Sequence, residues 1–127
     1  MSTLVTSNIS DGTTSVGTGY VVNGSAKAWV NFNGTGTVAI RDSINVSSLT
    51  DYATGNYGSN FTNAFNAADY VAFSGNGDSP AGGDVYTVVS QWTFSSASSF
   101  RAYAYTGAFS TAVDSDYGNY SFLGELA

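Results

Sequence analysis

The chain has 127 residues, of which 43% are hydrophobic and only 9% charged, and its net charge is −6. Three cations are too few for a nucleic-acid or anionic-membrane surface, and the absence of Cys and His excludes disulfides, thiol nucleophiles and imidazole-based zinc sites. Ser, Thr, Asn and Gly, which are poor helix formers, make up nearly half of the sequence, so we expect an all-β protein.

Residues 1–25 form the first predicted unit, an N-terminal arm. Its apolar residues are sparse, and the dipeptides Asp11-Gly12 and Asn23-Gly24 interrupt them. An arm of this composition cannot build its own core, so we expect it to add strands to the following domain or to a neighbouring copy. Its apolar residues are therefore candidates for a subunit interface: Leu4, Val5, Ile9 and Val16.

The clearest element after the arm is a hairpin of strands 25–33 and 37–44 around a Gly-Thr-Gly turn. If Phe32 lies opposite Val38, both strands alternate with period two and place their apolar residues on the same face. This register predicts six further pairs, and they include Val30 with Ile40, Ala28 with Asp42, Ala26 with Ile44, and Trp29 with Arg41.

Two of these pairs contain residues that suit a ligand platform or a subunit contact. Trp29 and Arg41 are interpreted as a cross-strand cation–π pair in preference to a sugar platform, because a stacked pair offers no free face. Asp42 falls on the apolar face. We expect the strand to bend there so that the carboxylate reaches water, in preference to a buried pair with a cation of another copy.

Short strands follow at a spacing typical of a β-sandwich or barrel. The stretch 62–69 has the only plausible helical turn, and we interpret it as a short connection. The strand 57–61 has only Tyr57 and Phe61 as large residues, so we expect it to be weak. We predict an antiparallel β-sandwich of about seven strands over residues 26–127, with the later strands at 46–51, 57–61, 70–74, 85–94, 100–106 and 117–124.

Two of these strands are apolar on both faces, namely 85–94 and 100–106. A strand of this kind is usually covered on both faces, and so short a chain has little material with which to cover it. A second copy of the chain is a reasonable source of the cover. We therefore expect an oligomer, with Tyr103 and Tyr105 as further interface candidates.

The amino-acid sequence is distinctive over Gly24–Phe65. The run AKAWVNFNGTGTVAIRDSINVSSLTD, followed by NYGSNFTNAF, resembles a β-domain family of tail-fibre and virion-surface proteins of tailed phages, notably marine ones. The similarity continues more weakly through SSFRAYAYTGAF and SDYGNYSFLG. The matching residues are typical of the scaffold, and no binding residue is carried over from the family.

The resemblance implies a homotrimeric tip or knob on the surface of a phage virion. Such a protein would contact a host-surface glycan or envelope component, and its arm would join it to other virion proteins. A capsid-decorating protein is the alternative, since the chain is short and the arm could clasp shell subunits. Neither role requires a cofactor, nucleic acid or membrane insertion.

Strand alternation indicates where ligand contacts would lie. If 38–51 is one strand, loops 52–56, 75–84 and 107–116 emerge at one end, and turns 33–37, 62–68 and 95–99 at the other. The arm would then enter beside the first set of loops. Tyr and Asn in loops suit weak polar recognition. The predicted ligand-contact residues are Tyr52, Asn56, Tyr57, Asp78, Asp84, Asp114, Asp116 and Tyr117.

The acidic residues of these loops also suggest two kinds of chemistry that we disfavour. Asp78 and Asp84 do not have the spacing of a calcium loop, and calcium needs six to eight ligands. Asp114 and Asp116 lie in a Ser-rich loop without the pocket that would separate the pKa values of a glycosidase pair. We expect no metal and no catalytic residue.

Overall fold

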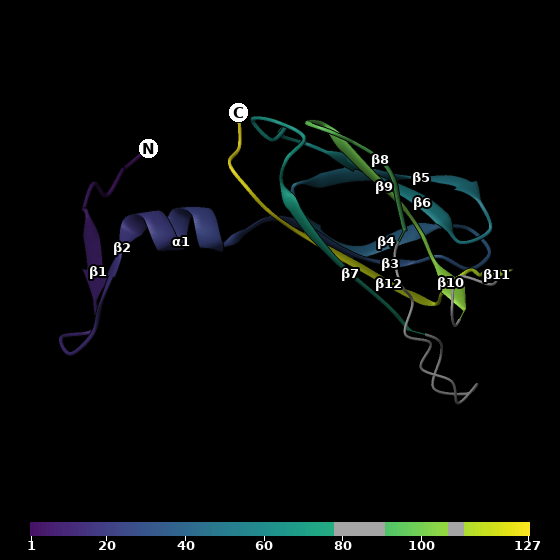
Figure 1. Ribbon diagram of the computed structural model, residues 1–127, viewed down its shortest axis with the longest axis horizontal. Helices are drawn as coiled ribbons and strands as arrows, with labels where there is room; N and C mark the ends of the chain where they lie inside the picture. Colours follow the sequence, from purple (N-terminus) through teal and green to yellow (C-terminus); the bar gives the residue numbers. More distant parts are fainter. Residues whose placement is uncertain (78–90, 107–110) are drawn as a thin grey trace.

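The computed structural model describes residues 1–77, 91–106 and 111–127. Nearly all regular structure in these ranges is β-strand, which confirms the all-β prediction (Figure 1). One short helix, α1 (Thr18–Gly24), lies in the described residues. The strands are β1 (Asn8–Ser10), β2 (Ser15–Gly17), β3 (Ala26–Asn33), β4 (Ala39–Ile44), β5 (Val46–Ala53), β6 (Asn56–Phe61), β7 (Val71–Gly77), β8 (Gln91–Ser96), β9 (Ser99–Tyr103), β10 (Tyr105–Thr106), β11 (Thr111–Ala112) and β12 (Tyr117–Leu123).

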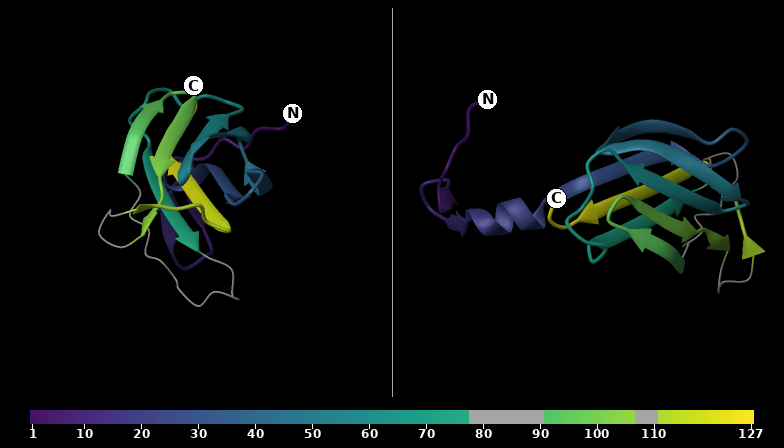
Figure 2. Two further views of the ribbon diagram at one scale, coloured as in Figure 1. Left: turned by 90° about the vertical axis from the view of Figure 1, so that its right-hand side faces the viewer. Right: turned by 90° about the horizontal axis from the view of Figure 1, so that it is seen from above.

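The longer strands form two four-stranded antiparallel sheets. The first sheet has the order β4-β3-β12-β7, and the second has the order β5-β6-β9-β8. In the first sheet, β12 lies between β3 and β7, so the end of the chain pairs with its first long strand. Of the predicted strand 85–94, the part before Gln91 lies outside the described residues. Figure 2 shows the same elements from two further directions.

The core consists of apolar side chains that alternate along the strands, as the period-two pattern predicts. Aromatic rings from the two sheets touch each other there. Phe32 of β3 lies 5.2 Å from Tyr57 of β6, and Phe122 of β12 lies 4.9 Å from Phe61 of β6, measured between ring centroids. Edge-to-face pairs of this kind contribute about 0.5–1.5 kcal/mol each beyond the burial of their area. Aromatic packing therefore joins the two sheets.

Strand β6, which we expected to be weak, is paired with β5 on one side and β9 on the other. Its small residues have a packing role. A Cβ atom at Gly58 would lie only 2.9 Å from the ring of Tyr52, so the missing side chain makes room for that ring. Ser59 is fully buried. Small residues at these positions indicate close cover by neighbouring groups, whereas the sequence pattern alone indicated weakness.

The register of the predicted hairpin is wrong by two residues. Phe32 pairs with Ile40 and not with Val38, because the connection covers five residues, 34–38. The side chain of Asn33 explains the wider turn. Its Nδ2 donates to the carbonyl of Thr35 at 2.8 Å, and its Oδ1 accepts from the backbone N–H of Thr35 at 3.3 Å. An Asn side chain that bonds the backbone two residues on replaces the tight turn that the glycines suggested.

A β-bulge then moves the second half of β4 by a further residue. The pairing shifts between Asn31 and Phe32, and Arg41 is the extra residue. Asp42 consequently lies opposite Asn31 on the outer face. Its carboxylate is exposed to water, as expected, but its predicted place on the apolar face is wrong. Trp29 pairs with Ile44, so the predicted Trp29–Arg41 pair is wrong.

The stretch 38–51 is two strands, with Asn45 between them at φ 56°. Asn is one of the few residues that adopts this left-handed conformation readily. Its side chain also bonds the next turn, since its Oδ1 accepts from the backbone N–H of Asn63 at 2.7 Å. Segment 62–69 contains no helix and serves as the predicted connection, anchored by the buried Phe65.

The two strands in 38–51 change which loops share an end. Turn 34–38 lies with Gly55, Ala104 and residues 113–116, and we call this the loop end. Asn45, residues 62–70, Ala97 and residues 124–127 lie at the opposite, arm end, where β3 begins. The prediction that turn 33–37 lies opposite the candidate loops, and that the arm enters beside them, is therefore wrong.

The arm has secondary structure of its own. β1 and β2 form an antiparallel hairpin, and α1 leads from it into β3 (Figure 1). Helix α1 has no side-chain cap and no buried residue, and it was not predicted from the sequence. A helix this short is marginal in water unless other groups pack on it. Its apolar residues are exposed, with Tyr20 at 79% and Val22 at 58%.

Candidate functional site

The loop end brings together four segments that are distant in the sequence. The backbone N–H of Gly34 donates to the carbonyl of Ser115 at 2.8 Å, and that of Ala104 donates to Gly55 at 2.6 Å. The N–H of Val113 donates to Ala104 at 3.0 Å. β10 and β11 lie at this end, away from α1 (Figure 1). The predicted loops 52–56 and 107–116 do share this end as far as the structure describes them.

Tyr57 and Asp114 form the centre of the loop end. The Tyr57 hydroxyl lies 2.6 Å from Oδ1 of Asp114 and 2.8 Å from the carbonyl of Gly34. The same carboxylate oxygen accepts from the N–H of Gly55 at 2.7 Å. Burial raises the pKa of Tyr57 far above its ordinary value, and the hydrogen bond to Asp114 raises it further. These groups hold three loops together.

The neighbouring polar residues at the loop end also have partners within the protein. Thr35 donates from its hydroxyl to Oδ1 of Asp116 at 2.8 Å, and Ser115 donates to the carbonyl of Gly77 at 2.6 Å. Asp114 and Asp116 thus bond different segments and hold the loops of this end together. We call Thr35, Tyr57, Asp114, Ser115 and Asp116 the loop clamp.

The predicted ligand-contact residues that the structure describes separate into three groups. Asn56 and Tyr57 are buried, with 1% and 0% exposure, so their side chains do not face solvent. Asp114 and Asp116 are occupied in the loop clamp. Tyr52 and Tyr117 are exposed at 51% and 41%. Two predicted residues lie outside the described ranges, namely Asp78 and Asp84.

The rings of Tyr52 and Tyr117 each contact an arginine. The guanidinium of Arg41 lies 4.4 Å from the centroid of the Tyr117 ring, and its Nη1 donates to the carbonyl of Phe32 at 2.8 Å. The guanidinium of Arg101 lies 3.8 Å from the centroid of the Tyr52 ring. Arg41 thus stacks on Tyr117 and not on the predicted Trp29, and the Arg101–Tyr52 pair was not predicted.

The second pair belongs to a larger group on the outer face of the second sheet, which we call the Arg101 cluster: Tyr52, Asn56, Gly58, Arg101 and Tyr103. Arg101 lies opposite Gly58 in the sheet, and its Nε donates to Oδ1 of Asn56 at 2.8 Å. The ring of Tyr103 lies 5.9 Å from the guanidinium and stacks on Tyr105 at 5.5 Å. Sequence reasoning missed Arg101 as a surface group, although its place two residues before Tyr103 on an alternating strand is a signal.

The predicted interface residues are accessible to different degrees. The arm residues Leu4, Val5, Ile9 and Val16 are all exposed, whereas Tyr103 and Tyr105 are half-buried. The outer face of the first sheet has a further apolar strip, which the sequence did not indicate. Ser121 pairs with Trp29 and Phe73, and Trp29 pairs with Ile44. Ile44, Val71 and Phe73 are each more than half exposed.

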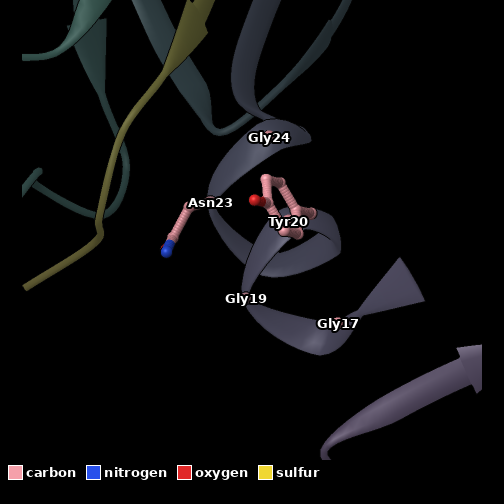
Figure 3. A pocket seen from close by; sticks show the side chains of 5 residues that line it. All are labelled: Gly17, Gly19, Tyr20, Asn23 and Gly24. Carbon is pink, nitrogen blue, oxygen red and sulfur yellow. The ribbon is translucent and has the colours of Figure 1, made fainter.

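Among the described residues, hollows lie along α1 and at the arm end. One, of about 600 Å³, lies along α1, where Tyr20 and Asn23 supply the side chains and three glycines supply backbone (Figure 3). The other, of about 270 Å³, lies at the arm end beside Tyr70, Asp69 and Glu125. Within the described ranges no three potential metal ligands gather. No helix of that part of the chain is long and apolar enough to span a bilayer.

Comparison with known proteins finds no matching family model, no matching curated protein and no matching solved structure. The likeness to phage virion-surface domains therefore remains an expectation from the sequence. The structure itself contributes two distinct ends, a loop clamp at one of them, and the Arg101 cluster on an outer sheet face.

Proposed function

We propose that the chain is a non-enzymatic virion protein of a tailed phage, a trimeric fibre tip that contacts the host surface through weak sites multiplied by avidity. The observation that carries the proposal is the separation of the molecule into two ends. The exposed apolar arm leaves from one end, and the clamped loops lie at the other. An attachment part at one end leaves the other end and the outer sheet faces free for recognition, which suits a protein displayed on a particle.

The two sheets with aromatic contacts between them support a β-sandwich knob over residues 26–127, which the arm precedes. A rigid sandwich holds its loops and outer faces in fixed geometry. Weak contacts at several such faces gain effective concentration when three copies bind together. Display on the virion surface follows from this role, with a host glycan or envelope component as partner.

Self-association is supported by uncovered apolar groups on both the arm and the first sheet. Tyr20, Val21 and Val22 of α1 are exposed, and so are Ile44 and Phe73 of the sheet. A soluble monomer rarely leaves such groups together in the open. We propose that the arm of one copy covers the outer face of the first sheet in the next copy, closing into a trimer.

The non-enzymatic role is supported by the two carboxylates nearest to a catalytic spacing. Asp114 accepts from Tyr57 and Gly55, and Asp116 accepts from Thr35. A glycosidase needs one protonated and one ionised carboxyl group facing a bond between sugars. Two carboxylates that are already engaged in loop contacts do not fit these roles.

Light scattering of the purified full chain tests the assembly, and binding to an array of bacterial surface polysaccharides tests the adhesion. We expect a trimer that binds at least one polysaccharide. The double variant Val22→Ser/Phe73→Ser should dissociate, whereas Thr13→Ser/Thr14→Ser, on the tip of the arm hairpin, should remain trimeric. A monomer that binds no member of the array would overturn the proposal.

A capsid-decorating protein is the second candidate. The observation that favours it is the arm itself, which has a hairpin and a helix without a buried residue. Such an arm suits the clasping of shell subunits. A reconstruction of virions that carry the protein separates the two functions, since copies will lie either on the shell or at the fibre tips.

A further inference from the structure

The Arg101 cluster has features of a binding site that the loop end lacks. We propose that the outer face of the second sheet binds an acidic glycan, with Arg101 contacting a sugar carboxylate and Tyr52 stacking on the sugar ring. This inference rests on the proposed adhesive function and names the class of ligand. It places the contact on a sheet face and not in the loops that the sequence favoured.

Arg101 is fixed in place before any ligand arrives. Its Nε is bonded to Asn56, whose side chain is almost completely buried with 1% exposure. Its flat guanidinium group is stacked on Tyr52 at 3.8 Å. Gly58 lies opposite Arg101 in the sheet and leaves space for the Tyr52 ring, as a Cβ there would lie 2.9 Å from that ring. An arginine held on two sides loses little conformational entropy on binding.

The contacts of Arg101 leave its recognition edge open. Stacking uses the face of the guanidinium, and Asn56 uses Nε, so the two terminal nitrogens have no hydrogen-bond partner among the described residues. These nitrogens lie in one plane and match the two oxygens of a carboxylate. Arg41 differs, because its Nη1 already donates to the carbonyl of Phe32.

The aromatic groups beside Arg101 suit a sugar. Arg101 and Gly58 contact one part of the Tyr52 ring, but Tyr52 is still 51% exposed. Unlike the stacked pair expected of Trp29 and Arg41, it therefore keeps ring surface open to a ligand. Tyr103 and Tyr105 continue the aromatic row with stacked rings. Rigid aromatic surface next to adaptable polar groups is a general pattern of recognition surfaces. Thr50 and Asn60, hydrogen-bonded to each other, extend the same face with polar atoms.

The negative net charge of the protein restricts acidic glycans to the position of Arg101. The chain has three cations and nine carboxylates, so the surface in general repels acidic polymers. Over distances beyond about 8 Å at physiological salt this repulsion is screened, and the local cation decides binding. An acidic glycan is therefore expected to bind at the Arg101 cluster and not to coat the surface.

The experiment measures binding of the full chain to an oligogalacturonate and to a neutral galacto-oligosaccharide of equal length. We expect the acidic oligomer to bind at least about tenfold more tightly, the effect of one charge-assisted pair. Arg101→Gln should bring the ratio of the two affinities close to one. Arg101→Lys keeps the charge without the planar fork and should lose most of the preference. Tyr52→Ser should weaken both oligomers.

Arg41→Gln is the matched control, since it removes the same charge from the other sheet and should keep the preference. Thermal melting verifies that each variant is folded. If Arg101→Gln does not fold, the binding preference of Arg101→Lys is the deciding measurement. The inference is overturned if the wild-type chain shows no acidic preference, or if the Arg41 and Arg101 variants lose it equally. A trimer that binds surface polysaccharides without that preference would leave the adhesive function standing and remove this site.

Discussion

The hydroxyl of Tyr57 lies 2.6 Å from Oδ1 of Asp114, although the two residues are 57 positions apart. Tyr57 comes from the second strand of the second sheet, and Asp114 from the loop that precedes the last strand. This contact, together with the Gly55 N–H on the same oxygen, converts separate loops into one rigid end. Substitutions at this end and in the core beneath it should therefore have distinct and measurable costs.

Tyr57→Phe should lower the free energy of unfolding by about 1–3 kcal/mol. The change keeps the ring that packs on Phe32 but removes the donor of a part-buried hydrogen bond to Asp114. Urea denaturation followed by tryptophan fluorescence measures the difference. An unchanged midpoint would mean that Asp114 exchanges this bond for water at no cost. The Tyr57–Asp114 contact would then contribute nothing to the free energy of unfolding.

Tyr120→Phe removes the same atom and should have the opposite effect. The Tyr120 hydroxyl is buried and has no hydrogen-bond partner among the described residues, and the residue is 2% exposed. Removal of an unsatisfied buried polar group is neutral or stabilising, and we expect a gain of up to about 1 kcal/mol. The pair Tyr57→Phe and Tyr120→Phe thus separates a bonded from an unbonded hydroxyl in one core. Destabilisation by both variants would contradict the assignment of Tyr120.

Stability should fall as the pH rises above about 10. Burial raises the pKa values of Tyr57 and Tyr120 above the ordinary tyrosine value, which the unfolded chain keeps. Below pH 10 both states hold these protons, so the full stability is present. Above it the unfolded state releases protons first, and each tyrosine lowers the free energy of unfolding by about 1.4 kcal/mol per pH unit until the folded-state pKa is reached.

Urea denaturation at pH values of about 8, 9, 10 and 11 measures this slope. Tyr120→Phe should show a shallower decline above about pH 10, because one proton fewer is involved. The same slope in both proteins would mean that Tyr120 ionises in the folded state as readily as in the unfolded one.

Gly55→Ala should be far more damaging than Gly36→Ala. Both glycines have positive φ, 65° and 62°, so alanine strains the backbone at either position by about 1–2 kcal/mol. At Gly36 nothing lies within 4 Å of the added Cβ, whereas at Gly55 it would lie 2.6 Å from the carbonyls of Ala104 and Val113. We expect a loss of several kcal/mol or no folded protein for Gly55→Ala, measured by thermal melting. Equal effects would show that the backbone at the loop end shifts freely.

The register of the first hairpin shows how far period-two reasoning reaches. The alternation in Ala28, Val30 and Phe32 was enough to assign the buried face of β3, because each of these residues touches the core independently of its partner strand. The pairing with β4 was not accessible in this way. It depends on the Asn33 side chain, which widens the turn, and on the bulge at Arg41, and both are settled by contacts that the alternation does not contain.

The candidate site shows the same division. Tyr52 was predicted as a contact residue and is exposed, but Asn56 and Tyr57, two neighbours in the same pattern, are buried. Their burial depends on β9 and on the loop at Asp114, which come much later in the chain. Arg101 gained its place because β6 and β9 are adjacent, and strand order in a sheet is not encoded in local composition.

Local sequence patterns were enough to predict the all-β class, the approximate strand positions and the apolar face of the hairpin, since composition, turn residues and period-two alternation act locally. The folded chain was needed to establish strand order, the split of 38–51 at Asn45 and the end at which the arm enters. Those features depend on the free energy of packing between distant segments, chiefly aromatic rings that meet across the two sheets and side chains that close loops, and no short stretch of sequence contains both partners.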